Sequence, residues 1–157
     1  MSIRQETRDA LVERLFMAAL GMGDLLTIYV GDKLGLYRAL AEGGSLTPGD
    51  LASRAGIFER YAREWLEQQA ASGVVEVNDV SAAEDERRYS LPEGHRETLL
   101  DPESPYSMAP VAKSFVAMAS AMPEVLDAFR TGKGVPWTAY GRDATVAQGD
   151  FNRPWLL

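Results

Sequence analysis

The sequence contains no cysteine and only one histidine among its 157 residues. The absence of cysteine excludes disulfides, thiolate nucleophiles and metal sites built on cysteine ligands. We therefore expect no metal centre. A chain without disulfides also fits the reducing environment of the cytoplasm, where we expect this protein to act.

Positive charge is scarce as well, because 16 lysine and arginine residues face 23 acidic residues and leave a formal net charge of −7. This excess repels phosphate backbones and anionic lipids, so we expect no nucleic acid and no membrane as a partner. The first residues include Glu6, Asp9 and Glu13, which do not fit a secretion signal. The longest strongly apolar run, Leu15 to Gly23, is about half of the roughly 20 residues that a membrane span needs.

Helical periodicity is abundant. Apolar residues recur at steps of three and four between residues 5 and 33, which predicts one long helix or two joined helices. Gly21, Gly23 and Gly31 each disfavour a helix interior by about 1 kcal/mol, so they indicate a kink or, as we prefer, close helix packing. The apolar surface of this segment exceeds what a small domain can cover, which predicts a homodimer.

Two shorter helices are predicted next. The string "KLGLYRALAEGG" has the pattern of a short helix that ends at its two glycines. Thr47 is placed to cap the next helix, Pro48 suits its first position, and Asp50 lies in its first turn. Gly56 is expected to end that helix.

A third helix and a hairpin complete a winged-helix order. The helix spans about residues 58–72, and one of its faces carries Phe58, Tyr61, Ala62, Trp65, Leu66 and Gln69. We interpret Tyr61 and Trp65 as core residues. The strings "VVEV" and "RYSL" predict two strands around a polar loop. The expected fold is mainly α, a winged helix-turn-helix with a two-stranded β-wing, flanked by a long N-terminal helix and further C-terminal helices.

The chain becomes helical again from Pro92. Helices are predicted in "PEGHRETLL", on both sides of Pro123, and from about residue 143 to 152. We divide the chain into residues 1–91, with the dimerisation helices and winged helix, and residues 92–157, a helical linker and lid segment. The apolar ending "RPWLL" leads us to expect a longer polypeptide.

The charges of the predicted winged helix disfavour DNA binding. The candidate recognition helix has Arg60 and Arg63 against three glutamates, and the wing from Asn78 to Arg88 has four acids against two arginines. Since phosphate neutralisation supplies most of the non-specific affinity for DNA, both surfaces lack the largest favourable contribution.

The order of several phrases resembles the N-terminal region of bacterial class I S-adenosylmethionine-dependent methyltransferases that carry a winged-helix dimerisation domain before the catalytic domain. The matching strings are "LLTIYVGDKLGLYRALAEGGSLTPGDLASRAGIFERYAREWLEQQAASGVVEV", "RYSLPEGH", "GKGVPWTAYG" and "FNRPWLL". One departure is that Ile57 and Phe58 stand where a polar helix cap is usual, at a cost of about 1 kcal/mol.

The resemblance implies that this winged helix serves dimerisation and covers a substrate, whereas a following Rossmann-like domain holds S-adenosylmethionine. That domain is absent from the chain. The strings Gly21-x-Gly23 and Gly132-x-Gly134 lack the third glycine of a cofactor-binding turn and follow no predicted strand. We therefore expect this chain alone to bind no cofactor, to contain no catalytic residue and to be inactive.

Four residues are our candidates for substrate binding in the parent enzyme, namely Trp137, Tyr140, Phe151 and Asn152. By resemblance, their segments lead to the catalytic cleft, where aromatic rings could close over an acceptor while Tyr140 and Asn152 form hydrogen bonds. The alternative is that Trp137 and Phe151 only pack helices. His95 is interpreted as solvent-facing or helix-capping rather than catalytic. Asp24 and Asp32 either contact a substrate or lie on an exposed helix face.

The function that we expect is thus the dimerisation and substrate-lid domain of a methyltransferase acting on a small-molecule acceptor, inactive by itself. Two alternatives stay open. One is a winged-helix transcriptional regulator, and the other is a stand-alone dimerisation or ligand-binding module.

Overall fold

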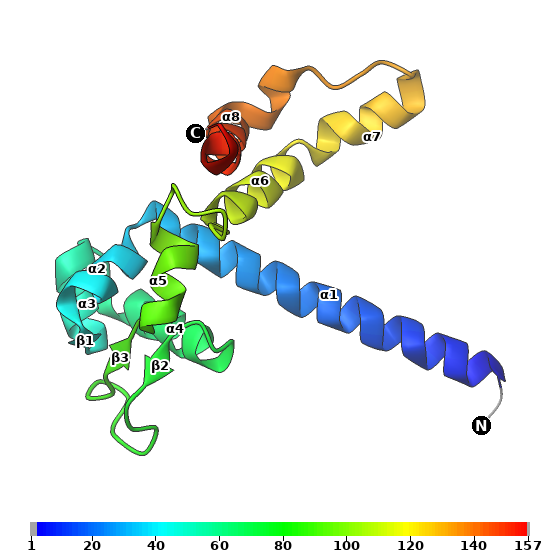
Figure 1. Ribbon diagram of the computed structural model, residues 1–157. Coiled ribbons are helices and arrows are strands. Elements are labelled where there is room, and N and C mark those ends of the chain that lie inside the picture. Colours follow the sequence, from blue (N-terminus) through cyan, green and yellow to red (C-terminus); the bar gives the residue numbers. More distant parts are fainter. Residues whose placement is uncertain (1–2, 157) are drawn as a thin grey trace.

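The computed structural model describes residues 3–156, and within them the chain is mainly helical (Figure 1). Leu157, at the apolar end of the sequence, lies outside the described residues. The elements are α1 (Ile3–Lys33), α2 (Leu36–Gly43), β1 (Ser45–Leu46), α3 (Pro48–Ala55), α4 (Glu59–Ala71), β2 (Glu76–Val77), β3 (Tyr89–Ser90), α5 (Glu93–Leu100), α6 (Ala109–Ser120), α7 (Met122–Thr131) and α8 (Gly141–Asn152), with short 3₁₀ helices η1 (Trp137–Tyr140) and η2 (Arg153–Trp155).

The winged helix forms as the sequence predicts, and local signals set its boundaries. Thr47 caps α3: its side chain accepts a hydrogen bond from the backbone N–H of Asp50, whose carboxylate accepts one from the N–H of Thr47. Such a capping box satisfies two N–H groups that would otherwise lack partners. Gly56 ends α3 with a φ of 67°, a conformation that glycine adopts without strain. Phe58, at the start of α4, makes no side-chain cap, as expected.

The sheet contains one strand more than the sequence predicts. β3 lies in the middle, with β1 on one side and β2 on the other, and both neighbours run antiparallel to it. Tyr89 lies opposite Leu46 of β1 and Val77 of β2. The prediction of a two-stranded wing was incomplete because β1 has only two residues, too few to produce an alternating pattern.

The core of the winged helix gathers side chains from α2, α3, α4 and β3. Its members with the least exposure are Leu36, Tyr37, Leu40, Leu51, Ala62, Leu66 and Tyr89. Trp65 is buried as predicted and meets Tyr37 edge to face, with ring centroids 5.1 Å apart. The assignment of Tyr61 to the core was wrong, because its side chain is 66% exposed. Tyr61 lies in the first turn of α4, near the even more exposed Phe58, on the side that faces solvent.

α1 is one continuous helix, rather than the two joined helices that the sequence also allowed. Gly31 is required by a close approach, because a Cβ atom there would lie 2.5 Å from the Tyr37 ring and 2.6 Å from the Trp65 ring. The close neighbours are thus side chains rather than another backbone. Nothing within the described chain approaches the equivalent positions at Gly21 and Gly23 within 4 Å.

The C-terminal helices form a separate layer that rests on the second half of α1 (Figure 1). α6 packs against both α1 and α8. Its contact with α8 is the most extensive contact between any two helices in the described chain. Small buried residues, Ala112, Ala117, Ala144 and Ala147, allow these helix backbones to approach closely. Within residues 3–156, no helix is both long and apolar enough to cross a membrane.

Candidate functional site

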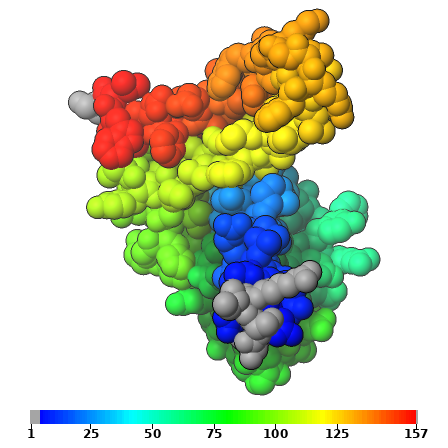
Figure 2. Space-filling model, turned by 90° about the vertical axis from the view of Figure 1, so that its right-hand side faces the viewer, coloured from blue at the N-terminus to red at the C-terminus, as the bar shows by residue number. Residues whose placement is uncertain are grey.

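The first half of α1 extends away from the rest of the chain (Figure 1) and carries an exposed apolar surface. We call it the α1 surface and define it by Leu11, Val12, Leu15, Phe16, Met17 and Leu20, which are 47–61% exposed. Leu11 and Leu15 form one row at four-residue spacing, Val12, Phe16 and Leu20 form the next row, and Met17 lies three residues before Leu20. Figure 2, which shows the side of the molecule at this end of α1, places α6–α8 on one side of the helix and the winged helix on the other. A contiguous apolar surface of this kind marks an interaction site.

A polar joint fixes α4 to the middle of α1. The Tyr37 hydroxyl donates a hydrogen bond to Gln69, and Gln69 Nε2 donates one to the Thr27 hydroxyl over 3.0 Å. Trp65 Nε1 donates to the Thr27 carbonyl over 2.9 Å. Burial raises the pKa of Tyr37 far above its usual range. The polar groups of Tyr37, Trp65 and Gln69 are thus paired within the protein. They hold the winged helix on α1 and are not available to bind or activate a substrate.

Asp24 belongs to the same joint. Its carboxylate accepts hydrogen bonds from Gln68 Nε2 at 3.0 Å and from the Ser72 hydroxyl at 2.5 Å. The sequence left open whether Asp24 contacts a substrate or lies on an exposed helix face. The structure instead shows it in contact with α4. In this structure the carboxylate attaches the C-terminal end of α4 to α1.

The surface that would contact DNA in a winged-helix regulator is neutralised by internal ion pairs. The pairs are Arg60–Glu64 at 4.0 Å, Arg63–Glu84 at 3.6 Å, Arg87–Glu67 at 3.3 Å and Arg88–Asp50 at 3.8 Å. Every arginine of the recognition helix and wing thus already has an acidic neighbour. Binding phosphates would require these pairs to exchange partners within an acidic surface.

The four candidate substrate-binding residues fall into two pairs. Trp137 and Tyr140 lie together in η1, with ring centroids 5.6 Å apart and planes tilted by 37°. Phe151 and Asn152 lie at the other end of α8, a helix of 12 residues that is about 18 Å long. Trp137, Phe151 and Asn152 are exposed, and Tyr140 is half-buried. The structure thus brings together the members of each pair and separates the pairs.

A belt of ion pairs, which the sequence reasoning missed, fastens α8 to α1. Lys113 of α6 bridges Asp32 at 3.1 Å and Asp150 at 3.4 Å, so Asp32 has a structural partner. Asp143 accepts hydrogen bonds from Lys33 Nζ at 2.6 Å and from the Tyr29 hydroxyl at 2.7 Å.

These contacts shift the titration of the groups on α1 and α8. The bonds from Lys33 and then Tyr29 lower the pKa of Asp143 below its usual value. The bond to Asp143, followed by burial, raises the pKa of Tyr29 above its usual value. Both shifts favour the protonation states in which the belt is closed at neutral pH.

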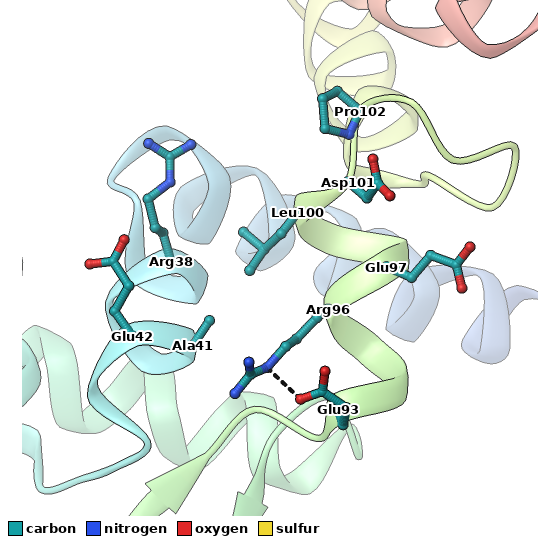
Figure 3. Close-up of a pocket in the computed structure, with 9 residues that line it drawn as sticks. All are labelled: Arg38, Ala41, Glu42, Glu93, Arg96, Glu97, Leu100, Asp101 and Pro102. Atoms are coloured by element: carbon teal, nitrogen blue, oxygen red, sulfur yellow. Dashed lines mark ion pairs between the residues drawn. The ribbon is translucent and has the colours of Figure 1, made fainter.

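A shallow hollow of about 760 Å³ lies between α2 and α5 (Figure 3). Arg96 extends from α5 toward α2, with its Nε 3.1 Å from the carboxylate of Glu93. Arg38 and Glu42 stand on α2 across the hollow, while Glu97 points away from it. The hollow has no nucleophile or histidine, and within the described residues no cluster of potential metal ligands occurs. Its charged side chains form a solvated surface.

His95 lies in the first turn of α5, where it is half-buried rather than solvent-facing. Its Nδ1 is 2.9 Å from the carbonyl oxygen of Val74. The side chain thus connects α5 to the turn after α4, and among residues 3–156 no acidic side chain bonds to it in the manner of a catalytic base.

Comparisons with known proteins agree with this architecture. A family model described as the Rv2258c-like winged HTH domain matches residues 22–101. No curated protein matches significantly.

Similar solved structures include three small-molecule methyltransferases. N,N-8-amino-8-demethyl-D-riboflavin dimethyltransferase (RosA) from Streptomyces davawensis is 21% identical with a TM-score of 0.65, over 92% of this chain and 44% of that chain. Mitomycin 7-O-methyltransferase MmcR is 24% identical with a TM-score of 0.65, over 96% and 45%. Human N-acetylserotonin methyltransferase in complex with SAM is 19% identical with a TM-score of 0.65, over 90% and 46%. The chain thus spans less than half of the length of each, and the likeness concerns the fold.

Proposed function

Since the chain belongs to the family of Rv2258c-like winged HTH domains, we propose that it is the dimerisation and substrate-lid part of an S-adenosylmethionine-dependent methyltransferase. The fold that it shares with small-molecule methyltransferases supports the association with such an enzyme. The acceptor would be a small molecule. The catalytic domain and its S-adenosylmethionine site would lie outside these 157 residues.

The α1 surface is the observation that carries the dimerisation proposal. Covering the exposed half of one such side chain contributes on the order of 1 kcal/mol, and each chain offers six of them. Gly21 and Gly23 follow this surface along α1, and a Cβ atom at either position would have no atom of another part of the described chain within 4 Å. A second α1 can therefore come close at the glycines, which gives them a role that one chain alone does not supply.

The layer of α6, α7 and α8 supports the proposed lid. α6 and α8 rest on α1 through the ion pairs of Lys113 and Asp143, and α7 packs against α6, so a partner bound at α1 would also position this layer. The paired rings of Trp137 and Tyr140 would face an apolar acceptor. Excluding water and positioning the acceptor are the tasks of such a lid, whereas methyl transfer itself is left to the catalytic domain.

The absence of cysteine from the sequence permits a direct test of the dimer. Single variants Leu11→Cys, Leu15→Cys, Phe16→Cys and Leu20→Cys can form a disulfide only between two chains. Mild oxidation should cross-link one or more of them into covalent dimers. Val80→Cys is the matched control, because Val80 is also exposed and apolar but lies in the wing loop. Cross-linking of all α1 variants at or below the level of Val80→Cys would contradict the proposal.

A transcriptional regulator is the runner-up, and the ion pairs of the recognition helix and wing disfavour it. A gel-shift assay at low salt with random duplex DNA distinguishes the two functions, since low salt maximises the electrostatic contribution to binding. We expect no shift. A stable complex would instead support the regulator.

A further inference from the structure

A compact apolar hollow of about 270 Å³ lies where α1, the turn after α4, α5 and the start of α6 meet. Its walls come mainly from apolar side chains, and its polar groups are those of His95 and Thr98. The apolar side chains used below are Leu25, Ile28, Leu99 and Met108. None of the four candidate substrate-binding residues lines this hollow. It is therefore separate from the proposed lid, and an inference about it stands independently of the methyltransferase assignment.

The only histidine of the sequence presents a free acceptor at this hollow. His95 Nδ1 lies 2.9 Å from the carbonyl oxygen of Val74, and a carbonyl oxygen can only accept a hydrogen bond. In the neutral ring the proton is therefore on Nδ1, which leaves Nε2 as an acceptor. Within residues 3–156, Nε2 has no hydrogen-bond partner. A donor that enters the hollow would provide one.

The volume and lining define the size and charge of a ligand. An apolar cavity of about 150 Å³ in another protein holds benzene, so this hollow suits one or two fused rings. The absence of a charged side chain from its walls disfavours an ionised ligand, which would lose hydration without gaining a partner. Met108 is half exposed at the margin, and the flexible thioether of methionine adapts to a flat ring.

We propose that this hollow binds an uncharged aromatic molecule of one or two fused rings, whose single hydroxyl or ring N–H donates a hydrogen bond to Nε2 of His95. The rings lie against Leu25, Ile28 and Leu99. Binding there connects α1 with α5, two elements that both contact α6.

Indole and 1-methylindole are a matched pair of probes, because only indole carries the N–H donor. Because the chain has one histidine, its imidazole NMR signals report this site without overlap from another histidine. Indole added to the full 157-residue chain should shift these signals to saturation. We expect 1-methylindole to bind about fivefold more weakly, the effect of one neutral hydrogen bond.

Three variants locate the site. Isothermal titration calorimetry measures their affinity for the two probes, and circular dichroism checks that each variant folds. His95→Phe retains a ring but no acceptor, so the two probes should bind it with equal affinity. Met108→Trp fills the hollow and should abolish binding of both. Trp137→Ala changes the proposed lid and should leave the affinity for indole unchanged.

Three outcomes would overturn the proposal. One is an unchanged His95 signal up to the solubility limit of indole, and another is equal affinity of the wild-type chain for the two probes. The third is a His95 signal that shifts with protein concentration and not with indole, because a second copy of the chain would then occupy the hollow. The first two comparisons need no substitution, so a variant that fails to fold does not affect them.

Discussion

Lys113 of α6 places its Nζ 3.1 Å from the carboxylate of Asp32 on α1, although the two residues are far apart in the sequence. The Lys113 side chain is only 16% exposed and also lies 3.4 Å from Asp150 of α8. One cation therefore joins three helices. The packing of the C-terminal layer on α1 depends on this contact as well as on the buried alanines.

We expect Lys113→Met to destabilise the chain by about 1–3 kcal/mol, because it leaves the partly buried carboxylate of Asp32 without its cation and leaves Asp150 with only the exposed Arg153. The measurement is the urea dependence of circular dichroism at pH 7. Arg60→Met is the control, since the Arg60–Glu64 pair is well exposed and such pairs contribute about 0–1 kcal/mol. Equal midpoints for the two variants would contradict the role of the bridge.

The stabilisation provided by Asp143 should depend on pH. The pKa of its carboxyl is lowered in the folded chain, first by Lys33 and then by Tyr29. The carboxylate therefore stabilises the fold above the usual aspartate pKa of about 4, and this contribution is lost as the pH falls through the lowered pKa. Asp143→Asn should thus be less stable than the wild type at pH 7 and approach it near pH 2.

The test of this pH dependence is a series of urea midpoints between pH 7 and pH 2. Asp127→Asn, on the exposed side of α7, controls for the loss of any one carboxylate. A difference between Asp143→Asn and the wild type that stays constant over the whole range would show that the Asp143 contacts do not act through ionisation.

Replacing Phe58 should increase stability. Phe58 is the N-cap of α4, its side chain forms no cap, and it is 79% exposed, so little packing is lost with the ring. We expect Phe58→Asn to raise the free energy of unfolding by about 1 kcal/mol, the usual difference between a capping and a non-capping residue. Thr47→Ala should lower it by a similar amount, because it removes an observed cap. A destabilised Phe58→Asn would mean that the ring has a partner in solution.

Local signals in the sequence predicted most of this fold. Thr47, Pro48 and Asp50 act within one helical turn, so the start of α3 could be predicted without any knowledge of tertiary structure. The spacing of Trp65 and Tyr61 placed both on one face, but periodicity does not show where a neighbouring element ends. Trp65 meets α1 and α2 and is buried, whereas Tyr61 lies beyond them.

The features that the sequence reasoning missed depend on contacts between distant segments. β1 consists of two residues that become a strand only because Tyr89 and Ser90 lie beside them. The ion pairs of Lys113 and Asp143 join helices whose order in the chain does not reveal their proximity. For the candidate substrate residues, the order of the motifs indicated which part of the chain carries them but not how far apart they lie. The length of α8 separates Trp137 and Tyr140 from Phe151 and Asn152.

The chain alone should not bind S-adenosylmethionine. A nucleotide fingerprint requires a glycine-rich turn between a strand and a helix, and no strand within residues 3–156 leads into such a turn. Isothermal titration calorimetry with S-adenosylmethionine should give no heat of binding, with the same titration on a methyltransferase as the positive control. Micromolar affinity for this chain would contradict the assignment of the cofactor to a separate catalytic domain.

Sedimentation equilibrium of the chain tests most directly whether the α1 surface holds two chains together. We predict a mass of twice the 17.2 kDa of one chain at micromolar concentration. The double variant Leu15→Glu and Phe16→Glu should have the mass of one chain and an unchanged circular dichroism spectrum, while Val80→Glu should remain dimeric. A wild-type mass of 17.2 kDa up to the highest soluble concentration would contradict the account.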